Sequence, residues 1–296
     1  MPQGVYASKI VFANKQKFGY TIIMSVGVEI KPVIKEYIWG REIWYQMPPV
    51  SNCILVKKIE THDKLSVQVH PNNEYAFNNE NGSPGKTEVW LITKAIDGAG
   101  VYYGFNKEYT KKEIEAHIEN GTLENTLNFC KVKRGDIFLV EAGTVHAIGA
   151  GIELLETQQN SDITYRLYDY NRLDKNKKKR QLHINKALDV INLKPTQIPK
   201  AIEFTSLSDK TASRQVCRIK EFSVLEYFIE EKMGINLAPN VSAIVYFNFG
   251  TGEIFANNQT FYYKQGDVFL FDQEIKNYTI IPKTKSQIIV SKSSCV

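Results

Sequence analysis

The 296-residue chain has few cysteines, and none of them are closely spaced. The four are Cys53, Cys130, Cys217 and Cys295, and no pair has C-x-x-C spacing. A disulfide framework is therefore not expected in a chain of this length, and reduced thiols in a cytoplasm fit better. The lack of clustered thiolates also argues against a closed structural zinc site.

Long apolar runs and concentrated positive charge are missing as well. No stretch approaches the roughly 18 to 20 apolar residues that a membrane span needs. The net charge of +5 is spread thinly, which is weak evidence for nucleic acid and compatible with an anionic small substrate. The basic run at 175–180 is either a phosphate or nucleic-acid patch or a solvated loop, and the loop is favoured because like charges repel and stay hydrated.

Residues 1–23 differ in character from the remainder of the chain, and we expect an N-terminal extension there. A signal peptide is not favoured, because the apolar part at 20–28 is short and no A-x-A site comes after it. A biological start at Met24 is left open.

The chain beyond this extension is rich in short strand patterns, which predicts a mostly β protein. The expected strands are 54–60, 65–69, 88–93, 100–105, 136–140 and 162–170. Thr110 and Glu113 predict a helix start by forming a capping box, and residues 184–193 predict a second helix. Pro195 and Pro199 then mark a linker between two domains, which we place at 24–200 and 201–296.

An internal repeat supports two domains of similar plan. The stretch KRGDIFLVEAGTVH at 133–146 matches KQGDVFLFDQEIKN at 264–277, with Gly135 aligned to Gly266. His146 of the first copy is replaced by Asn277, and Gly143 by Glu274. The second domain is therefore expected to lack metal ligands.

Polar residues interrupt the strands of the first copy. In LSVQVHP, Gln68 and His70 share one face of the expected strand, opposite an apolar face. Glu88 begins an apolar strand, where an inward carboxylate is costly unless it is paired or bound to a metal. With His146, these groups suit a divalent cation with open positions for substrate. A hydrogen-bonded structural role for either histidine is the alternative.

Two other features have two interpretations each. Lys86 lies on the same expected face as Glu88, either as a surface partner or as a cation that contacts an anionic substrate or donates a proton. In the run 153–166, the residues Glu156, Asp162 and Arg166 share a face if the run is extended. That face is either solvated or the polar interior of a barrel.

Five segments, WGREIW, LSVQVHP, GKTEVW, GDIFLVEAGTVHAIG and QQNSDITYRLYDYNR, resemble the type I mannose-6-phosphate isomerase family in its shorter bacterial form. The resemblance runs from about Lys31 to Arg172 and is weaker beyond. It implies a cupin (jelly-roll) β-barrel followed by a degenerate cupin-like domain, with a few short helices and one zinc ion per chain. It also implies an enzyme of mannose metabolism. We expect this enzyme to be cytoplasmic and a monomer or homodimer.

The resemblance also assigns roles to residues. The implied metal ligands are Gln68, His70, Glu88 and His146. Arg166, Lys86 and Glu156 are the implied catalytic residues, and Ser66, Lys86 and Asp162 are the implied substrate-binding residues. Between Glu156 and Lys86, the general base stays open.

The expected reaction interconverts mannose 6-phosphate and fructose 6-phosphate through a metal-stabilised cis-enediol. Two alternatives are another metal-dependent cupin enzyme, such as an oxygenase or epimerase, and a non-catalytic sugar-phosphate sensor on the same barrel. Neither nucleic acid nor a membrane is an expected partner.

Overall fold

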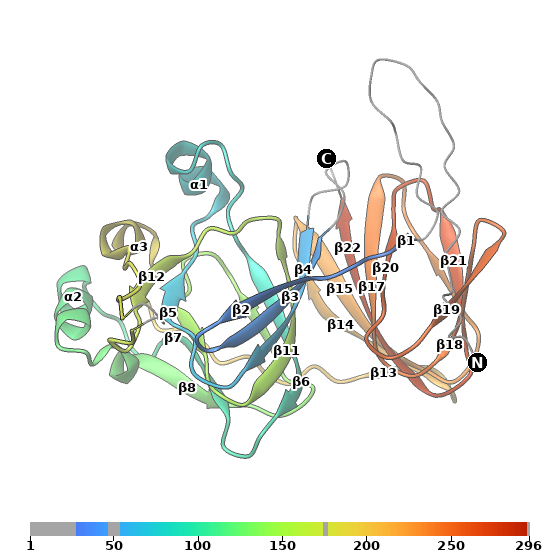
Figure 1. The fold of residues 1–296 in the computed structure, drawn as a ribbon, viewed down its shortest axis with the longest axis horizontal. Coiled ribbons are helices and arrows are strands. Elements are labelled where there is room, and N and C mark those ends of the chain that lie inside the picture. The colour runs from blue at the N-terminus through green and yellow to red at the C-terminus, as the bar shows by residue number, and fades with distance from the viewer. Residues whose placement is uncertain (1–27, 47–53, 174–176, 295–296) are drawn as a thin grey trace.

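The computed structural model describes residues 28–46, 54–173 and 177–294. The chain forms two β-rich bodies that lie side by side, each built from two sheets (Figure 1). The expected extension at 1–23, Cys53 and Cys295 lie outside the described residues. Cys130 and Cys217 are buried and free. None of the helices in the described ranges is long and apolar enough to cross a membrane.

The first body contains a six-stranded antiparallel sheet on the side that faces the second body. Its strands, in spatial order, are β2 (Val33–Tyr37), β3 (Gly40–Gln46), β4 (Ile54–Thr61), β11 (Ile152–Gln159), β6 (Glu88–Ala95) and β9 (Ile137–Val140). Both faces of β4 and β11 are buried, because one faces the interior of this body and the other faces the second body.

A five-stranded sheet closes the other side of the first body. Its strands, in order, are β12 (Tyr165–Tyr168), β5 (Val67–Val69), β10 (His146–Ile148), β7 (Gly100–Phe105) and β8 (Leu127–Lys131). The two sheets share an apolar core that includes Trp90 and Ile92 of β6 and Val101 and Tyr103 of β7.

The first body has three α-helices in the described ranges. They are α1 (Asn73–Asn79), α2 (Lys111–Glu119) and α3 (Ile184–Val190), and a 3-10 turn, η2, spans Leu123–Thr126. Helices α2 and α3 lie on the outer side of the five-stranded sheet, and α1 stands at one end of the body (Figure 1). The predicted capping box of α2 is confirmed, since Thr110 and Glu113 cap each other's backbone N–H groups. Helix α3 is shorter than predicted, and α1 was not predicted.

The second body has a seven-stranded and a four-stranded sheet. The first has the order β1 (Val28–Glu29), β20 (Val268–Phe271), β17 (Val241–Phe249), β22 (Ser286–Ser294), β15 (Phe222–Ile229), β14 (Thr211–Arg218) and β13 (Thr205–Ser208). The second has the order β16 (Met233–Asn236), β21 (Asn277–Pro282), β18 (Gly252–Ala256) and β19 (Gln259–Tyr263). Aromatic side chains fill the space between them, including the stacked pair Phe271 and Tyr278 at 4.0 Å.

The predicted repeat is visible in the hydrogen bonds of the two K-x-G-D turns. The backbone N–H of Lys133 donates to Asp136 Oδ2 at 2.9 Å, and that of Lys264 donates to Asp267 Oδ2 at 2.9 Å. The glycines between them, Gly135 and Gly266, have φ of 93° and 88°, a region that glycine adopts without strain. The same turn therefore starts β9 in one body and β20 in the other.

This equivalence shows what replaces the polar residues in the second body. Glu88 pairs with Val140 on β9, and Ala243 pairs with Phe271 at the matching place on β20. Ala243 therefore occupies the position of Glu88, while Asn277 is the repeat counterpart of His146. An apolar interior replaces the polar one.

One apolar core joins the two bodies. It combines residues of the six-stranded sheet, such as Val56 and Leu155, with residues of the seven-stranded sheet, such as Val224 and Ile289. Thr157 and Ser291 hydrogen-bond across this boundary at 2.7 Å. Strand β1, from the start of the expected first domain, pairs with β20 of the second body. The exact domain bounds stay a prediction.

Candidate functional site

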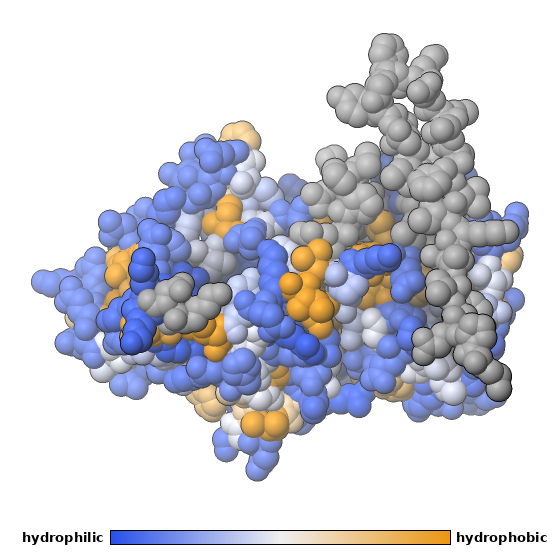
Figure 2. Space-filling view, in the orientation of Figure 1, coloured by the Kyte–Doolittle hydropathy of each residue, from blue (hydrophilic) through white to orange (hydrophobic). Residues whose placement is uncertain are grey.

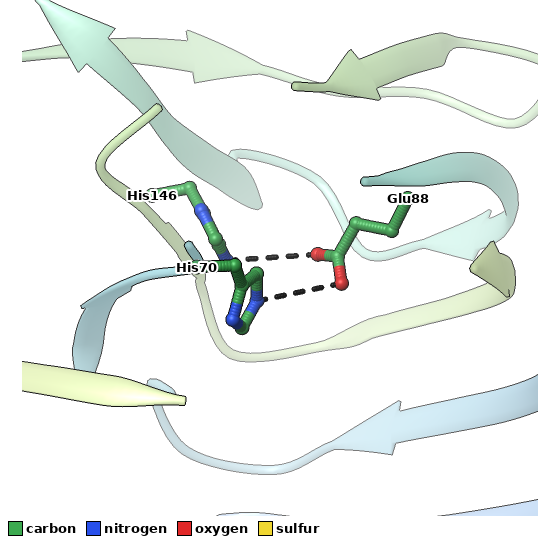
Figure 3. A group of neighbouring side chains, drawn as sticks. All are labelled: His70, Glu88 and His146. Atoms are coloured by element: carbon green, nitrogen blue, oxygen red, sulfur yellow. Dashed lines mark ion pairs between the residues drawn. The ribbon is translucent and has the colours of Figure 1, made fainter. Parts of the chain in front are cut away.

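Three side chains from three strands or their ends converge inside the first body (Figure 3). They are His70, Glu88 and His146, and one ligand atom of each lies within 4.8 Å of the others. His70 Nε2 is 3.5 Å from Glu88 Oε2, and His146 Nε2 is 3.6 Å from Glu88 Oε1. All three are buried, with exposed fractions of 1%, 0% and 0%. The structure thus brings these three predicted residues together, and their role as metal ligands stays a prediction.

The strand register explains this convergence. On β5, Gln68 lies opposite His146 of β10, and His70 lies just past the strand end. Glu88 starts β6, and its side chain points between the two imidazoles (Figure 3). The apolar residues Val67 and Val69 of β5 pack outside the site, in the core beneath helices α2 and α3.

Backbone carbonyls fix both imidazoles in one tautomer. Nδ1 of His70 lies 2.7 Å from the Ile163 carbonyl oxygen, and Nδ1 of His146 lies 2.8 Å from that of Thr144. A carbonyl can only accept, so each Nδ1 carries the hydrogen and each Nε2 presents a lone pair to the centre. Burial lowers the pKa of His70 to about 3 and also lowers the pKa of His146, which keeps both rings neutral.

This arrangement fits a metal ion such as zinc. Ligand atoms about 2.1 Å from a tetrahedral zinc ion lie about 3.4 Å apart, close to the two observed separations. Gln68 adds a fourth group, because its amide nitrogen is 3.3 Å from His146 Nε2. A half-turn of that amide places its oxygen there, and an amide oxygen is a metal ligand. Gln68 therefore lies next to the triad, on the His146 side.

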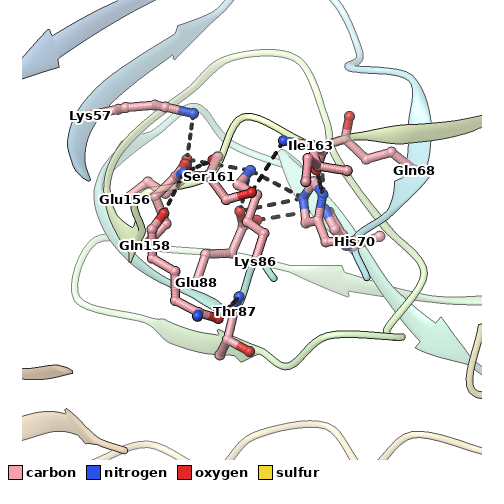
Figure 4. Close-up of polar contacts among 12 residues, drawn as sticks. Lys57, Gln68, His70, Lys86, Thr87, Glu88, Glu156, Gln158, Ser161 and Ile163 are labelled. Atoms are coloured by element: carbon pink, nitrogen blue, oxygen red, sulfur yellow. Dashed lines mark hydrogen bonds and ion pairs between the residues drawn. The ribbon is translucent and has the colours of Figure 1, made fainter. Parts of the chain in front are cut away.

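Two lysines and two glutamates form a row of alternating charge beside the triad (Figure 4). Lys86 Nζ is 2.7 Å from Glu88 Oε2 and 4.0 Å from Glu156 Oε1, and Lys57 Nζ is 3.2 Å from Glu156 Oε1. All four side chains are almost fully buried. Such buried charges are tolerated because each has an opposite charge beside it.

The pKa values in this row reflect burial and pairing. Burial lowers the pKa of Lys86, but Glu88 and Glu156 outweigh burial and raise it overall. Burial raises the pKa of Glu88, yet Lys86 and His70 hold it well below its usual value. Burial and the charge of Glu88 raise the pKa of Glu156. The two carboxylates therefore differ in proton affinity although both are buried.

The indole of Trp90 links these two carboxylates. Its Nε1–H lies 3.0 Å from Glu88 Oε1 and 3.0 Å from Glu156 Oε2, and the side chain is fully buried. The edge of the same ring contacts His146, with centroids 5.4 Å apart. One tryptophan thus fixes the relative positions of three predicted site residues.

A cavity of about 260 Å³ opens beside the triad. The other predicted site residues all border it, and they are Ser66, Gln68, Lys86, Glu156, Asp162 and Arg166. Arg166 Nε donates to Ser66 Oγ at 3.2 Å. The run 153–166 is not one extended strand, because it turns between β11 and β12, but both segments contribute to the cavity. The sequence-predicted residues therefore surround one space.

Sequence reasoning missed several residues of this cavity. Lys57, Glu42, Arg180 and the stacked rings of Tyr37 and Trp39 also border it. Lys57 had a recognisable signal, because its same-face neighbours in the strand ILVKKIE, Leu55 and Ile59, are both apolar. Nothing in the basic run 175–180 distinguishes Arg180 from a surface residue.

A larger cavity of about 320 Å³ lies elsewhere on the first body. Surface ion pairs such as Arg41–Glu60 and Lys94–Glu153 line it, and none of the predicted site residues does. It has none of the buried, converging groups found at the smaller cavity.

Known proteins similar to this chain are mannose-6-phosphate isomerases. The mannose-6-phosphate isomerase ManA of Bacillus subtilis is 52% identical over 140 residues, which cover 47% of this chain and 44% of that protein. A second B. subtilis protein, named "Putative mannose-6-phosphate isomerase YvyI", is 36% identical over 243 residues, covering 80% of this chain and 74% of the relative. No family model matches the chain.

The fold agrees with these relatives. The crystal structure of the mannose 6-phosphate isomerase from B. subtilis aligns with a TM-score of 0.80 and 28% identity, over 90% of this chain and 99% of that one. The predicted mostly β, cupin-type architecture is therefore confirmed.

Proposed function

The chain belongs to the mannose-6-phosphate isomerase family, and we propose that it interconverts D-mannose 6-phosphate and D-fructose 6-phosphate. In this aldose–ketose isomerisation a proton leaves C2, a cis-enediol forms, and a proton returns at C1. The observation that carries the proposal is the position of the His70–Glu88–His146 triad beside a cavity lined by both carboxylate and cationic side chains. Such a site can polarise sugar oxygens and move a proton in the same space.

Zinc is the proposed cofactor, one ion per chain, held by His70, Glu88, His146 and the amide oxygen of Gln68. Two neutral imidazoles and one carboxylate without a thiolate are typical of catalytic zinc sites. When bound, the ion supplies Lewis acidity toward the oxygens at C1 and C2 of the sugar.

Glu156 is the proposed base that moves the proton between C2 and C1. It borders the cavity, and Trp90 holds its Oε2 at 3.0 Å, which leaves Oε1 beside Lys57 and Lys86. Lys86 is the weaker candidate for the base, because its ammonium is engaged with Glu88 at 2.7 Å. Its charge instead stabilises negative charge that develops on the substrate.

Arg166, Ser66 and Asp162 are the proposed contacts for the rest of the substrate. Arg166 lies at the cavity wall with its Nε on Ser66 Oγ and its Nη1 on the Gln181 carbonyl oxygen at 2.8 Å. These contacts hold the guanidinium in one orientation, so its charge can orient an anionic sugar derivative. The carboxylate of Asp162 is exposed at the same cavity and can accept a sugar hydroxyl.

An isomerase assay tests the proposal. Mannose 6-phosphate is incubated with the protein, with and without a metal chelator, and fructose 6-phosphate is measured. We expect turnover that a chelator abolishes and zinc restores. His146→Ala should abolish turnover and lower the bound zinc, while His62→Ala, at an exposed histidine outside the site, should change neither. Turnover that resists the chelator, or full activity in His146→Ala, contradicts the proposal.

The same samples separate the alternatives. A cupin oxygenase would carry iron after purification, so metal analysis distinguishes it from an isomerase. A sugar-phosphate sensor would bind mannose 6-phosphate without turning it over. The cytoplasmic location, the monomeric or homodimeric state, and the domains at 24–200 and 201–296 stay predictions.

A further inference from the structure

Near the mouth of the cavity, one buried carboxylate holds two arginines. Asp169 is 5% exposed and comes directly after β12. Arg172 Nη2 donates to its Oδ1 at 2.6 Å, and Arg180 donates to both oxygens, with Nε at 2.7 Å from Oδ2. Burial raises the pKa of Asp169, but Arg180 and Arg172 outweigh burial and lower it overall. The carboxylate is therefore ionised and can orient both guanidinium groups.

The two arginines differ in what else they contact. Arg172 Nη1 binds Asp63 Oδ2 at 3.0 Å and the Lys64 carbonyl oxygen at 2.5 Å, and Arg172 does not border the cavity. Arg180 does border the cavity. Within the described ranges, Asp169 is its hydrogen-bonding partner, through Nε and one Nη2 hydrogen. Three of its five N–H groups thus remain for a ligand.

Arg166 and Arg180 form a pair of cations at the same cavity. The segment that carries Arg180 is joined to β12, because Arg166 Nη1 donates to the Gln181 carbonyl oxygen and the His183 backbone N–H donates to the Arg166 carbonyl oxygen at 2.8 Å. Burial lowers the pKa of Arg166, and the nearby charge of Arg180 lowers it further. Two guanidinium groups that repel each other at a cavity gain from an anion placed between them.

We propose that Arg180, oriented by Asp169, is a specificity-determining residue that binds the phosphate of the substrate together with Arg166. This inference rests on the proposed function for the identity of the substrate. A phosphate monoester carries a charge of about −1.5 to −2 near neutral pH and offers three acceptor oxygens. The guanidinium of Arg166 and the N–H groups of Arg180 that do not contact Asp169 supply positive charge and planar hydrogen-bond donors for these oxygens. Arg180 thus selects phosphorylated over free sugars, and Asp169 is a positioning residue.

The first test compares Arg180→Gln, Arg180→Lys and the unmodified protein in steady-state kinetics. Arg180→Gln should raise the KM for mannose 6-phosphate by about 10- to 100-fold, the range expected for a lost charged hydrogen-bonding partner, with a much smaller change in kcat. Inorganic phosphate should inhibit the unmodified enzyme competitively. Its inhibition constant should be higher for Arg180→Gln by a similar factor. Arg180→Lys should restore part of the affinity for mannose 6-phosphate and for inorganic phosphate, because lysine keeps the positive charge but lacks the planar set of guanidinium donors.

Arg172→Gln is the matched control, because Arg172 shares Asp169 but does not border the cavity. It should lower the melting temperature and leave the KM and the inhibition by phosphate near their original values. Asp169→Asn should raise the KM less than Arg180→Gln does, because Arg180 remains present but loses its fixed orientation. An unchanged KM in Arg180→Gln, or an equal rise in Arg172→Gln, overturns the inference.

Calorimetry with inorganic phosphate separates this inference from the proposed function. If the unmodified protein does not isomerise mannose 6-phosphate but binds phosphate in an Arg180-dependent way, the proposed function fails and the phosphate site stands. If the unmodified protein isomerises the sugar and Arg180→Gln does so with the same KM and phosphate affinity, the inference alone fails.

Discussion

Replacing Trp90 by phenylalanine tests whether Glu156 acts as the base. The indole Nε1–H is shared between Glu88 Oε1 and Glu156 Oε2, at 3.0 Å from each. Phenylalanine keeps most of the ring but removes this donor. A hydrogen bond to a charged group is worth about 1.5–3 kcal/mol, so the share of Glu156 is about 1 kcal/mol. Since one pKa unit corresponds to about 1.4 kcal/mol, the pKa of Glu156 should rise by roughly 0.7 of a unit.

The role of the group sets the direction of the change. A base must be deprotonated, so activity rises with pH through the pKa of Glu156, which burial already raises. Loss of the donor disfavours the carboxylate further. The acidic limb of the kcat/KM profile should therefore move to higher pH in Trp90→Phe, while the basic limb stays in place.

The assay is a pH profile of kcat/KM at saturating zinc, because Glu88 also loses a donor and zinc affinity could fall with it. Tyr103→Phe is the control, since it removes a hydroxyl of the same core that donates to the Leu139 carbonyl oxygen at 2.6 Å and to neither glutamate. An acidic limb that does not move in Trp90→Phe, with zinc fully bound, would refute the assignment of the base.

Two further predictions concern stability. Arg214→Met should lower the free energy of unfolding by about 3–5 kcal/mol in urea titrations, because it leaves the buried carboxylate of Glu226, now 2.6 Å from Arg214 Nε, without its cation. The exposed Arg218→Met on the same strand should cost less than about 0.5 kcal/mol, and equal losses would contradict this account. In the metal-free protein, the melting temperature should fall as the pH drops from about 6.5, the pKa of an unperturbed histidine, toward the lower pKa of His70. Below pH 6.5 the unfolded chain binds protons that buried His70 and His146 do not, so acid favours unfolding. A melting temperature that stays constant over this range would argue against neutral, buried imidazoles.

Local patterns in the sequence predicted much of this structure. The alternation in LSVQVHP places Gln68 and His70 on one face, and the structure confirms that this face meets His146. The K-x-G-D repeat predicts a common turn in both bodies, and the same hydrogen bonds occur in each. Such features depend on period and turn chemistry within a few residues, which the sequence displays directly.

Features that depend on distant contacts were not predictable. Lys57 is a site residue because the pairing of β4 with β11 places it opposite Glu156, and spacing along the chain does not reveal that register. Arg180 lies in a basic run whose composition is typical of a solvated loop, and Asp169 orients it from eleven positions away. The pairing of β1 with β20 likewise brings the start of the described chain to its far end.

The six-stranded sheet has a consequence for natural variation among relatives. On β11, Glu156 and Gln158 face the interior of the first body, whereas the alternating residues Leu155 and Thr157 meet the other body. The interior of the second body, where Ala243 stands in the place of Glu88, is therefore free to vary, but the surface that this body presents to β11 is not. Among relatives, substitutions at Thr157 should therefore accompany substitutions at Ser291, as they do at the interface between two subunits of a dimer.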